Sequence, residues 1–167
     1  PETRRAAFDA VVGNGAQISW VGFATPGGIV TTASGGILEG QSVAQGPWFR
    51  QGLDDSYAGD MYQTALLPSV LQGQNGSSSH VLDLARLVFD ANGQTIGVMC
   101  MHIDFAWVEA FLKRSAEALG LDVYLLNETG DVVLATDDVV YEDLNLATVT
   151  RAKTGLDGSA LETWPDG

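Results

Sequence analysis

The sequence has few basic residues, and this limits its partners. Its 167 residues include 8 Lys and Arg against 21 Asp and Glu, which gives a formal net charge of −13. Such a charge repels the phosphates of nucleic acids and of anionic lipid headgroups, so we expect no nucleic-acid binding. Hydrophobic residues make up 46% of the chain and charged residues 17%, which is typical of a folded globular protein.

Cysteine and long apolar runs are also scarce. Cys100 is the single cysteine, so no intramolecular disulfide can form, and its place in the apolar run Ile96–Ile103 favours a buried thiol. No stretch approaches the roughly 18 consecutive apolar residues of a membrane span, and no signal peptide is recognisable. The final residues Trp164–Gly167 form a turn sequence that normally joins two strands, so we interpret the sequence as a piece of a longer protein.

Nucleotide and calcium motifs are missing as well. The sequence has no Gly-rich phosphate loop ending in Gly-Lys-Ser/Thr. The segment Asp90–Gly93 begins like a calcium loop, but Thr95 and Met101 stand where that loop needs its glycine and its glutamate. We therefore expect Asp90–Gly93 to be a hairpin turn.

Catalytic and metal sites are not expected either. Ser42 lacks the closing glycine of a nucleophile elbow. The two histidines, His80 and His102, are predicted to lie on opposite faces of a strand pair, too far apart to join in a zinc site. We expect no catalytic residue, no bound metal and no cofactor.

Hydrophobic periodicity and turn residues predict an α+β fold. Helical spacing of apolar residues marks four segments: Glu2–Val12, Pro47–Leu53, Asp60–Leu71 and Trp107–Leu119. Strand pairs joined by turn residues are expected at Ile18–Ala24 with Ile29–Ala33, His80–Phe89 with Gln94–Phe105, and Leu121–Leu126 with Val132–Ala135. The third pair repeats the layout of the first, which indicates that a second α+β unit begins near Gly120.

An ordered series of segments resembles the double Cache domains, which are PAS-like domains outside the membrane in bacterial histidine kinases, diguanylate cyclases and chemoreceptors. The segments include Trp20–Phe23, Pro47–Phe49, Tyr57–Asp60, Leu82–Ala85 and Gly97–Ile103. The resemblance implies an α+β fold with a PAS-like antiparallel five-stranded sheet and an N-terminal helix, followed by a truncated second PAS-like unit. Residues 1–119 would form the membrane-distal, ligand-binding unit, and residues 120–167 the incomplete membrane-proximal unit.

The same resemblance implies a function. The chain would be the periplasmic part of an inner-membrane receptor that senses a small molecule, with its membrane anchor outside this sequence and no enzyme activity of its own. The resemblance is also compatible with a homodimer. A cytoplasmic PAS-type dimerisation module is the main alternative, and a small hydrolase is a more distant one.

Three positions depart from the family pattern. Gly46 replaces a frequent arginine, Tyr62 replaces a frequent histidine, and His102 replaces the aspartate of members that bind amino acids. These departures leave the expected fold intact, but they leave the ligand class open.

The register of the central hairpin defines a candidate site without reference to the family. If a four-residue turn pairs Phe89 with Gln94, one face of the sheet carries the following opposed pairs: Ala85 and Val98, Asp83 and Cys100, Val81 and His102. The opposite face is apolar and suits packing against a helix. The first face therefore combines polar groups with small side chains, as a small-molecule pocket requires.

The predicted ligand-binding residues come from this face and from the segments that could cover it. They are Asp83, Cys100, His102 and Asp104 on the strands, and Trp48, Phe49, Tyr57 and Tyr62 above them. A protonated His102 would favour an anion and Asp83 an amine, so a carboxylate or an amino-acid-like metabolite is expected. The alternatives are that His102 and Asp83 are structural, and that Trp48 and Phe49 belong to the core.

Overall fold

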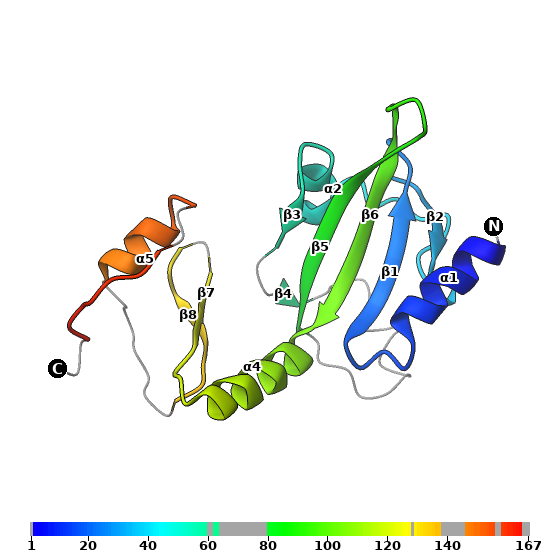
Figure 1. Cartoon of the computed structure of the whole chain (residues 1–167). Coiled ribbons are helices and arrows are strands. Elements are labelled where there is room, and N and C mark those ends of the chain that lie inside the picture. Colours follow the sequence, from blue (N-terminus) through cyan, green and yellow to red (C-terminus); the bar gives the residue numbers. More distant parts are fainter. Residues whose placement is uncertain are drawn as a thin grey trace. The chain divides into compact units, whose positions relative to one another are not determined.

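An antiparallel sheet forms the centre of the N-terminal part of the chain (Figure 1). The computed structural model describes residues 2–59, 62–63, 80–127, 129–137, 146–155 and 158–164. The chain divides into two units, Pro1–Val108 and Glu109–Gly167, so the boundary falls within helix α4 (Phe105–Leu119). Among the described residues, no helix has both the length and the apolar character needed to cross a bilayer.

The sheet of the first unit joins two hairpins. Its strands are β1 (Ile18–Ala24), β2 (Val30–Ala33), β3 (Tyr57–Ala58), β4 (Tyr62–Gln63), β5 (His80–Phe89) and β6 (Thr95–Asp104). They follow the order β2-β1-β6-β5-β3, with β4 also paired to β5, and every pairing is antiparallel. The short strands β3 and β4 thus share one edge of a sheet that is five strands wide. The predicted antiparallel PAS-like sheet, with both hairpins in it, is confirmed.

The predicted register of the β5–β6 hairpin is wrong by two residues. Asp83 lies opposite His102, and Ala85, rather than Asp83, lies opposite Cys100. A shift of two residues keeps each side chain on the same face of a strand, whereas a shift of one would reverse it. The predicted residues therefore still share one face of the sheet, and on that face Asp83 and His102 are direct neighbours.

The turn and a bulge each contribute one residue to this shift. The Asp90 N–H donates to the Gln94 carbonyl over 2.9 Å, so the loop has three residues instead of four. A β-bulge follows, after which Gly97 pairs with Val88. Gly97 has a φ of 154°, and a Cβ atom there would lie 2.0 Å from the Ala24 carbonyl oxygen of β1. Glycine at this position lets β1 approach β6.

The α-helices of the first unit follow the predicted pattern except in one segment, and the 3-10 helix was not predicted. They are α1 (Glu2–Val12), the 3-10 helix η1 (Ser34–Gly36), α2 (Pro47–Gly52) and α4. The predicted helix Asp60–Leu71 is wrong at Tyr62–Gln63, where the backbone forms β4; its other residues lie outside the described part of the chain. Pairing with β5 outweighs the helical spacing there, as tertiary context often does for local propensity.

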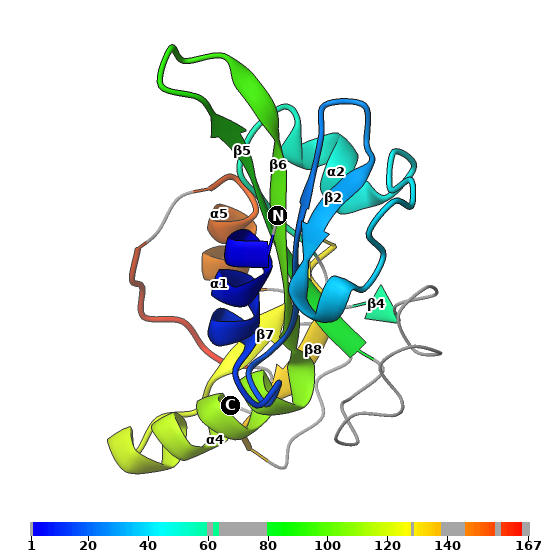
Figure 2. The ribbon, with the colours of Figure 1, turned by 90° about the vertical axis from the view of Figure 1, so that its right-hand side faces the viewer.

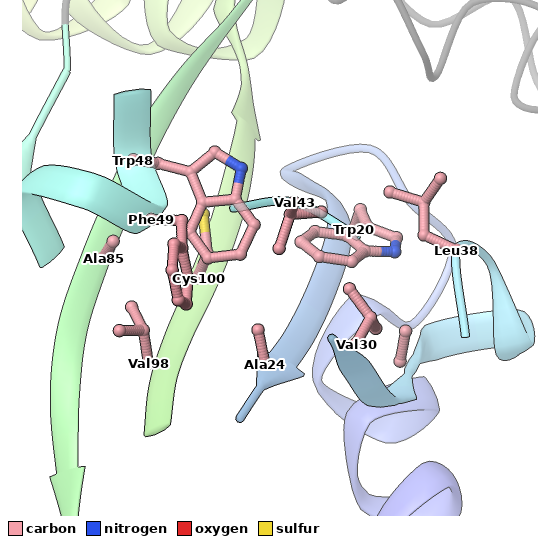
Figure 3. Packing of buried hydrophobic residues seen from close by; sticks show 11 residues of the cluster. Trp20, Ala24, Val30, Leu38, Val43, Trp48, Phe49, Ala85, Val98 and Cys100 are labelled. Atoms are coloured by element: carbon pink, nitrogen blue, oxygen red, sulfur yellow. The ribbon is translucent and has the colours of Figure 1, made fainter. Parts of the chain in front are cut away.

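The core of the first unit lies between the sheet and α2. Its buried hydrophobic cluster, shown in Figure 3, consists of Trp20, Ala24, Val30, Ala33, Leu38, Val43, Trp48, Phe49, Ala85, Val98 and Cys100. Gly52 lets α2 lie close to the sheet, because a Cβ atom at this position would be 2.8 Å from Val98 and 3.1 Å from Ala85. Helix α1 lies on the opposite face of the sheet from α2 (Figure 2).

Helix α1 is held mainly by polar contacts at one edge of the sheet. It packs against β1, β2 and η1, and none of its side chains is fully buried. The Arg5 guanidinium pairs with the Glu39 carboxylate, and this pairing lowers the pKa of Glu39. Asp9 accepts a hydrogen bond of 2.7 Å from the Gly35 N–H. These contacts tie α1 to the segment that follows β2.

The second unit contains a smaller sheet. Strands β7 (Tyr124–Leu126) and β8 (Val132–Ala135) form an antiparallel pair, which confirms the third predicted hairpin. Helix α5 (Ala147–Ala152) begins where the Glu162 carboxylate accepts hydrogen bonds from the N–H groups of Ala147 and Thr148. The truncation of this unit stays a prediction.

Candidate functional site

The candidate site is the face of the sheet that α2 covers. Strand pairing brings three rows of side chains together on this face, because alternate residues of each strand point the same way. The row on β5 is Asp83, Ala85 and Leu87, the row on β6 is His102, Cys100 and Val98, and the row on β1 is Trp20, Gly22 and Ala24. Polar groups thus occupy one end of the face and small apolar groups the other.

Asp83 and His102 form a buried pair at the polar end. Their side chains are 1% and 3% exposed, and Asp83 Oδ1 lies 3.2 Å from His102 Nε2. The distance suits a hydrogen bond but the direction does not, so neither ring nitrogen of His102 has an acceptable partner among the described residues. Buried polar groups in folded proteins normally have partners, which makes His102 a candidate for binding.

The protonation state of His102 differs from the protonated imidazole that an anion-binding site would require. Burial lowers the pKa of His102 to about 3, because the apolar surroundings disfavour the charged imidazolium. His102 is therefore neutral at physiological pH and brings no positive charge to the face. The preference for an anionic ligand that a protonated His102 would give is not supported.

Cys100 lies beside this pair, in the centre of the sheet. It is opposite Ala85 on β5 and opposite Gly22 on β1, and it is 0% exposed. Burial, followed by the negative charge of Asp83, raises the pKa of the Cys100 thiol well above its ordinary value. The predicted buried thiol is confirmed, and in this environment it is protonated.

Trp20 is the site neighbour that the sequence-based prediction missed. It lies opposite His102 on β1, with a ring-centroid distance of 4.7 Å to the imidazole and 6.2 Å to Trp48. Its indole N–H donates to the Ile37 carbonyl over 3.3 Å. The indole lies over Gly22, where a Cβ atom would be 2.0 Å from the ring. Alternation along β1 places Trp20 and Gly22 on one face, but no local pattern places that face beside His102.

The predicted covering residues are only partly brought together. Trp48 and Phe49 are 5% and 3% exposed and pack edge to face at 5.9 Å, above the part of the face that holds Cys100 (Figure 3). Tyr57 is partly buried on β3, opposite Ala85. Tyr62 contributes its backbone to β4, and its side chain lies outside the described part of the structure.

Asp104 has a structural role at the end of the same face. Its carboxylate accepts a hydrogen bond of 3.2 Å from the Trp107 N–H, in the first turn of α4. This contact is the N-cap interaction that satisfies a free N–H group at a helix start. Asp104 is 5% exposed, so it closes the polar end of the face and starts α4.

The site also contains a set of potential metal ligands. The carboxylate of Asp83, the sulfur of Cys100 and a ring nitrogen of His102 lie within 4.8 Å of one another, and all three residues are buried. The sequence analysis considered only the two histidines. The predicted register already places these three residues on one face, and the observed register brings Asp83 directly opposite His102.

The comparisons with known proteins concern the fold. No protein-family model and no curated protein matches the chain. Solved structures do. The sensor domain of the V. cholerae histidine kinase DctB has a TM-score of 0.51 at 15% identity, over 65% of this chain and 39% of that one.

Two chemoreceptor domains are also similar. The ligand-binding domain of the Pseudomonas aeruginosa amino-acid chemoreceptor PctC, in complex with GABA, has a TM-score of 0.55 at 18% identity, over 80% of this chain and 56% of that one. The sensory domain of the Campylobacter jejuni chemoreceptor Tlp3, with isoleucine bound, has a TM-score of 0.58 at 11% identity, over 92% of this chain and 58% of that one. The chain thus has the fold of bacterial sensory domains and spans less than two thirds of these relatives.

Proposed function

We propose that the chain is the small-molecule-sensing part of a transmembrane bacterial receptor. In this proposal it lies in the periplasm, a membrane anchor and an output domain lie outside the sequence, and the chain catalyses no reaction. Residues 1–119 bind the ligand, and residues 120–167 belong to a second PAS-like unit. The fold shared with sensory domains of a histidine kinase and of chemoreceptors supports this function over a cytoplasmic module or a hydrolase.

One observation carries the proposal: the sheet face beneath α2 buries Asp83 and His102 among aromatic side chains. Burying an imidazole without a hydrogen-bond partner among the described residues lowers stability, and buried ionisable groups of this kind cluster at functional sites. The imidazole nitrogens have no hydrogen-bond partner in the described part of the chain, so they can donate to and accept from a ligand.

The ligand class follows from the charges on the face. Asp83 supplies a carboxylate, His102 is neutral, and Trp20 offers an aromatic ring beside them. An ammonium group interacts favourably with a carboxylate and with aromatic rings. We infer that the ligand carries an amino group, as an amino acid or a small amine does, rather than being a simple carboxylate.

A thermal-shift screen tests the proposal. Amino acids, amines, small carboxylates and purines are added separately to the purified chain, and the unfolding temperature is measured. A ligand at a hundred times its dissociation constant adds about 2.7 kcal/mol of stability. An amino acid or amine should give the largest shift. If no compound with an amino group shifts the transition while a simple carboxylate does, the inferred ligand class is wrong.

A matched pair of charge-removing variants then locates the site. Asp83→Asn keeps the size of the side chain and removes its charge, so it should weaken binding of the identified ligand at least tenfold in calorimetry. Asp90→Asn makes the same change in the exposed turn of the hairpin and should bind normally. Equal affinities of both variants and the wild type would place the ligand elsewhere.

A further inference from the structure

Three side chains on the candidate face have the chemistry of a metal-ligand set. Cys100 and His102 are two residues apart on β6, so both point to the same side of the sheet, and Asp83 lies directly opposite His102 on β5. Their ligand atoms lie within 4.8 Å of one another. Backbone pairing in the middle of a sheet, rather than a loop, holds the three positions together.

The distances agree with a four-coordinate ion after a small adjustment. Around a tetrahedral zinc ion with bonds of about 2.0–2.1 Å to nitrogen and oxygen, neighbouring ligand atoms are about 3.3 Å apart. The separation between His102 Nε2 and Asp83 Oδ1 is 3.2 Å. Sulfur–zinc bonds are about 2.3 Å long, so the Cys100 side chain would have to shift by roughly 1 Å to close the set.

His102 supplies a second, independent observation. It is 3% exposed, and both of its ring nitrogens lack a hydrogen-bond partner among the described residues. A metal-binding histidine needs one ring nitrogen as a neutral donor, and a buried imidazole without acceptable hydrogen bonds has that nitrogen available.

We propose that Asp83, Cys100 and His102 together bind one divalent ion with the preferences of zinc. The set mixes a soft thiolate with imidazole and carboxylate, a combination that suits zinc and not calcium or magnesium. The thiolate and the carboxylate offset the two positive charges of the ion, so the filled site is neutral overall. Three protein ligands leave one position for water or for a donor atom of a ligand.

Metal binding exchanges the proton of the Cys100 thiol for the ion. The Cys100 thiol loses its proton to solvent, the sulfur lone pair forms the bond to the ion, and no electron is transferred. One proton is released for each ion bound. The inference goes beyond the proposed sensing of an organic molecule and holds whether or not such a ligand is found.

Cobalt titration of the metal-free chain tests the site. Co²⁺ replaces zinc in such sites and, when bound by a thiolate, gives a near-ultraviolet charge-transfer band together with intense visible bands of four-coordinate cobalt. Because Cys100 is the single cysteine, that charge-transfer band can come only from Cys100. We expect the band to saturate at one cobalt per chain and to disappear when zinc is added, since zinc binds more tightly. A wild-type chain without this band overturns the proposal.

Two ligand variants and one control variant provide the matched comparison. Cys100→Ser should lose the charge-transfer band completely, and Asp83→Asn should weaken cobalt binding at least tenfold. His80→Ala removes the other histidine, whose strand position pairs with Gln63 rather than with the site, and should keep the band and the affinity within about twofold of the wild type. Loss of the band in His80→Ala, or its persistence in Cys100→Ser, contradicts the assigned ligands.

A measurement on the wild-type chain guards against variants that fail to fold. Alkylation of Cys100 in mild denaturant is followed with and without one equivalent of zinc. We expect zinc to slow alkylation at least tenfold, because the ion occupies the thiolate and stabilises the folded state. An unchanged alkylation rate shows that zinc does not bind the thiol. The ligand screen is run on the metal-free chain, so failure of either proposal leaves the other standing.

Discussion

The two faces of the β5–β6 hairpin differ in an unusual way. The face beneath α2 buries Asp83 and His102 almost completely, whereas on the other face Leu84 is 37% exposed and Met99 and Met101 are only partly buried. Folded proteins generally bury apolar side chains and expose ionisable ones. On the face beneath α2 the ionisable side chains Asp83 and His102 are buried, whereas on the other face Arg86 and several large apolar side chains are closer to solvent.

On the face beneath α2, we expect stability and binding to depend on different side chains. A buried carboxylate and a poorly hydrogen-bonded imidazole lower stability, so the aromatic residues around them must provide the free energy that holds the face together. We expect changes to the aromatic residues to act on folding and changes to the polar ones to act on binding. The following substitutions test this division, beginning with the largest expected effect.

Removing the Trp20 side chain should destabilise the first unit most. Trp20 is 0% exposed and contacts both Trp48 and His102, so Trp20→Ala should lower the free energy of unfolding by about 3–5 kcal/mol in urea denaturation. Leu84→Ala, on the opposite face, should lower it by only about 1 kcal/mol, because its side chain is already 37% exposed. An equal loss in the two variants would show that the faces do not differ in this way.

Adding one methyl group beneath Trp20 should have the next largest effect. A Cβ atom at Gly22 would lie 2.0 Å from the indole, so Gly22→Ala must displace the ring and should lower stability by about 1–3 kcal/mol. Gly27→Ala is the control, since the nearest atom to a Cβ there is 3.9 Å away, and it should change stability by less than about 0.5 kcal/mol. Similar losses in both variants would mean that the Trp20 packing is not tight.

The sequence predicted correctly on which face of the sheet each residue lies, but it did not predict which residue lies opposite it on the neighbouring strand. Alternation along β5 and β6 placed Asp83, Cys100 and His102 on one side, and the turn and bulge moved the register by two residues without changing the side. The direct contact between Asp83 and His102 could not be foreseen, because a bulge of one residue leaves little trace in the hydrophobic pattern.

The place of Trp20 in the site depends on a pairing between distant strands, whereas the role of Asp104 depends on a local signal. Trp20 joins the site because β1 pairs with β6, about 80 residues later in the chain, and local patterns do not encode that pairing. The role of Asp104 was readable from sequence, since an aspartate directly before a helical pattern is an N-cap signature. The predicted helix began at Trp107, so Asp104 was placed on the sheet face and not at a helix start, and its ligand-binding role stays a prediction.

The N-cap interpretation of Asp104 gives a prediction of moderate size. Asp104→Ala removes the acceptor of the Trp107 N–H and should lower the free energy of unfolding by about 1 kcal/mol, whereas Asp104→Ser should retain most of the stability because serine also caps helices. The affinity for a ligand identified in the screen should be the same in both variants, as calorimetry would show. A loss of affinity in Asp104→Ser would instead assign Asp104 to the binding site.

The smallest stability change, and the sharpest test of the division between the faces, should come from His102→Leu. Neither ring nitrogen of His102 has an acceptable hydrogen-bond partner among the described residues, so replacing the imidazole by an apolar side chain removes no strong hydrogen bond. The leucine removes the desolvation cost of the buried imidazole but leaves Asp83 beside an apolar group, so we expect the stability of the metal-free variant to change by less than about 1 kcal/mol in urea denaturation. The same variant should lose cobalt binding and most of its affinity for an organic ligand. A loss of stability of more than about 2 kcal/mol would show that His102 holds the fold together, and the polar face would then be structural rather than a binding surface.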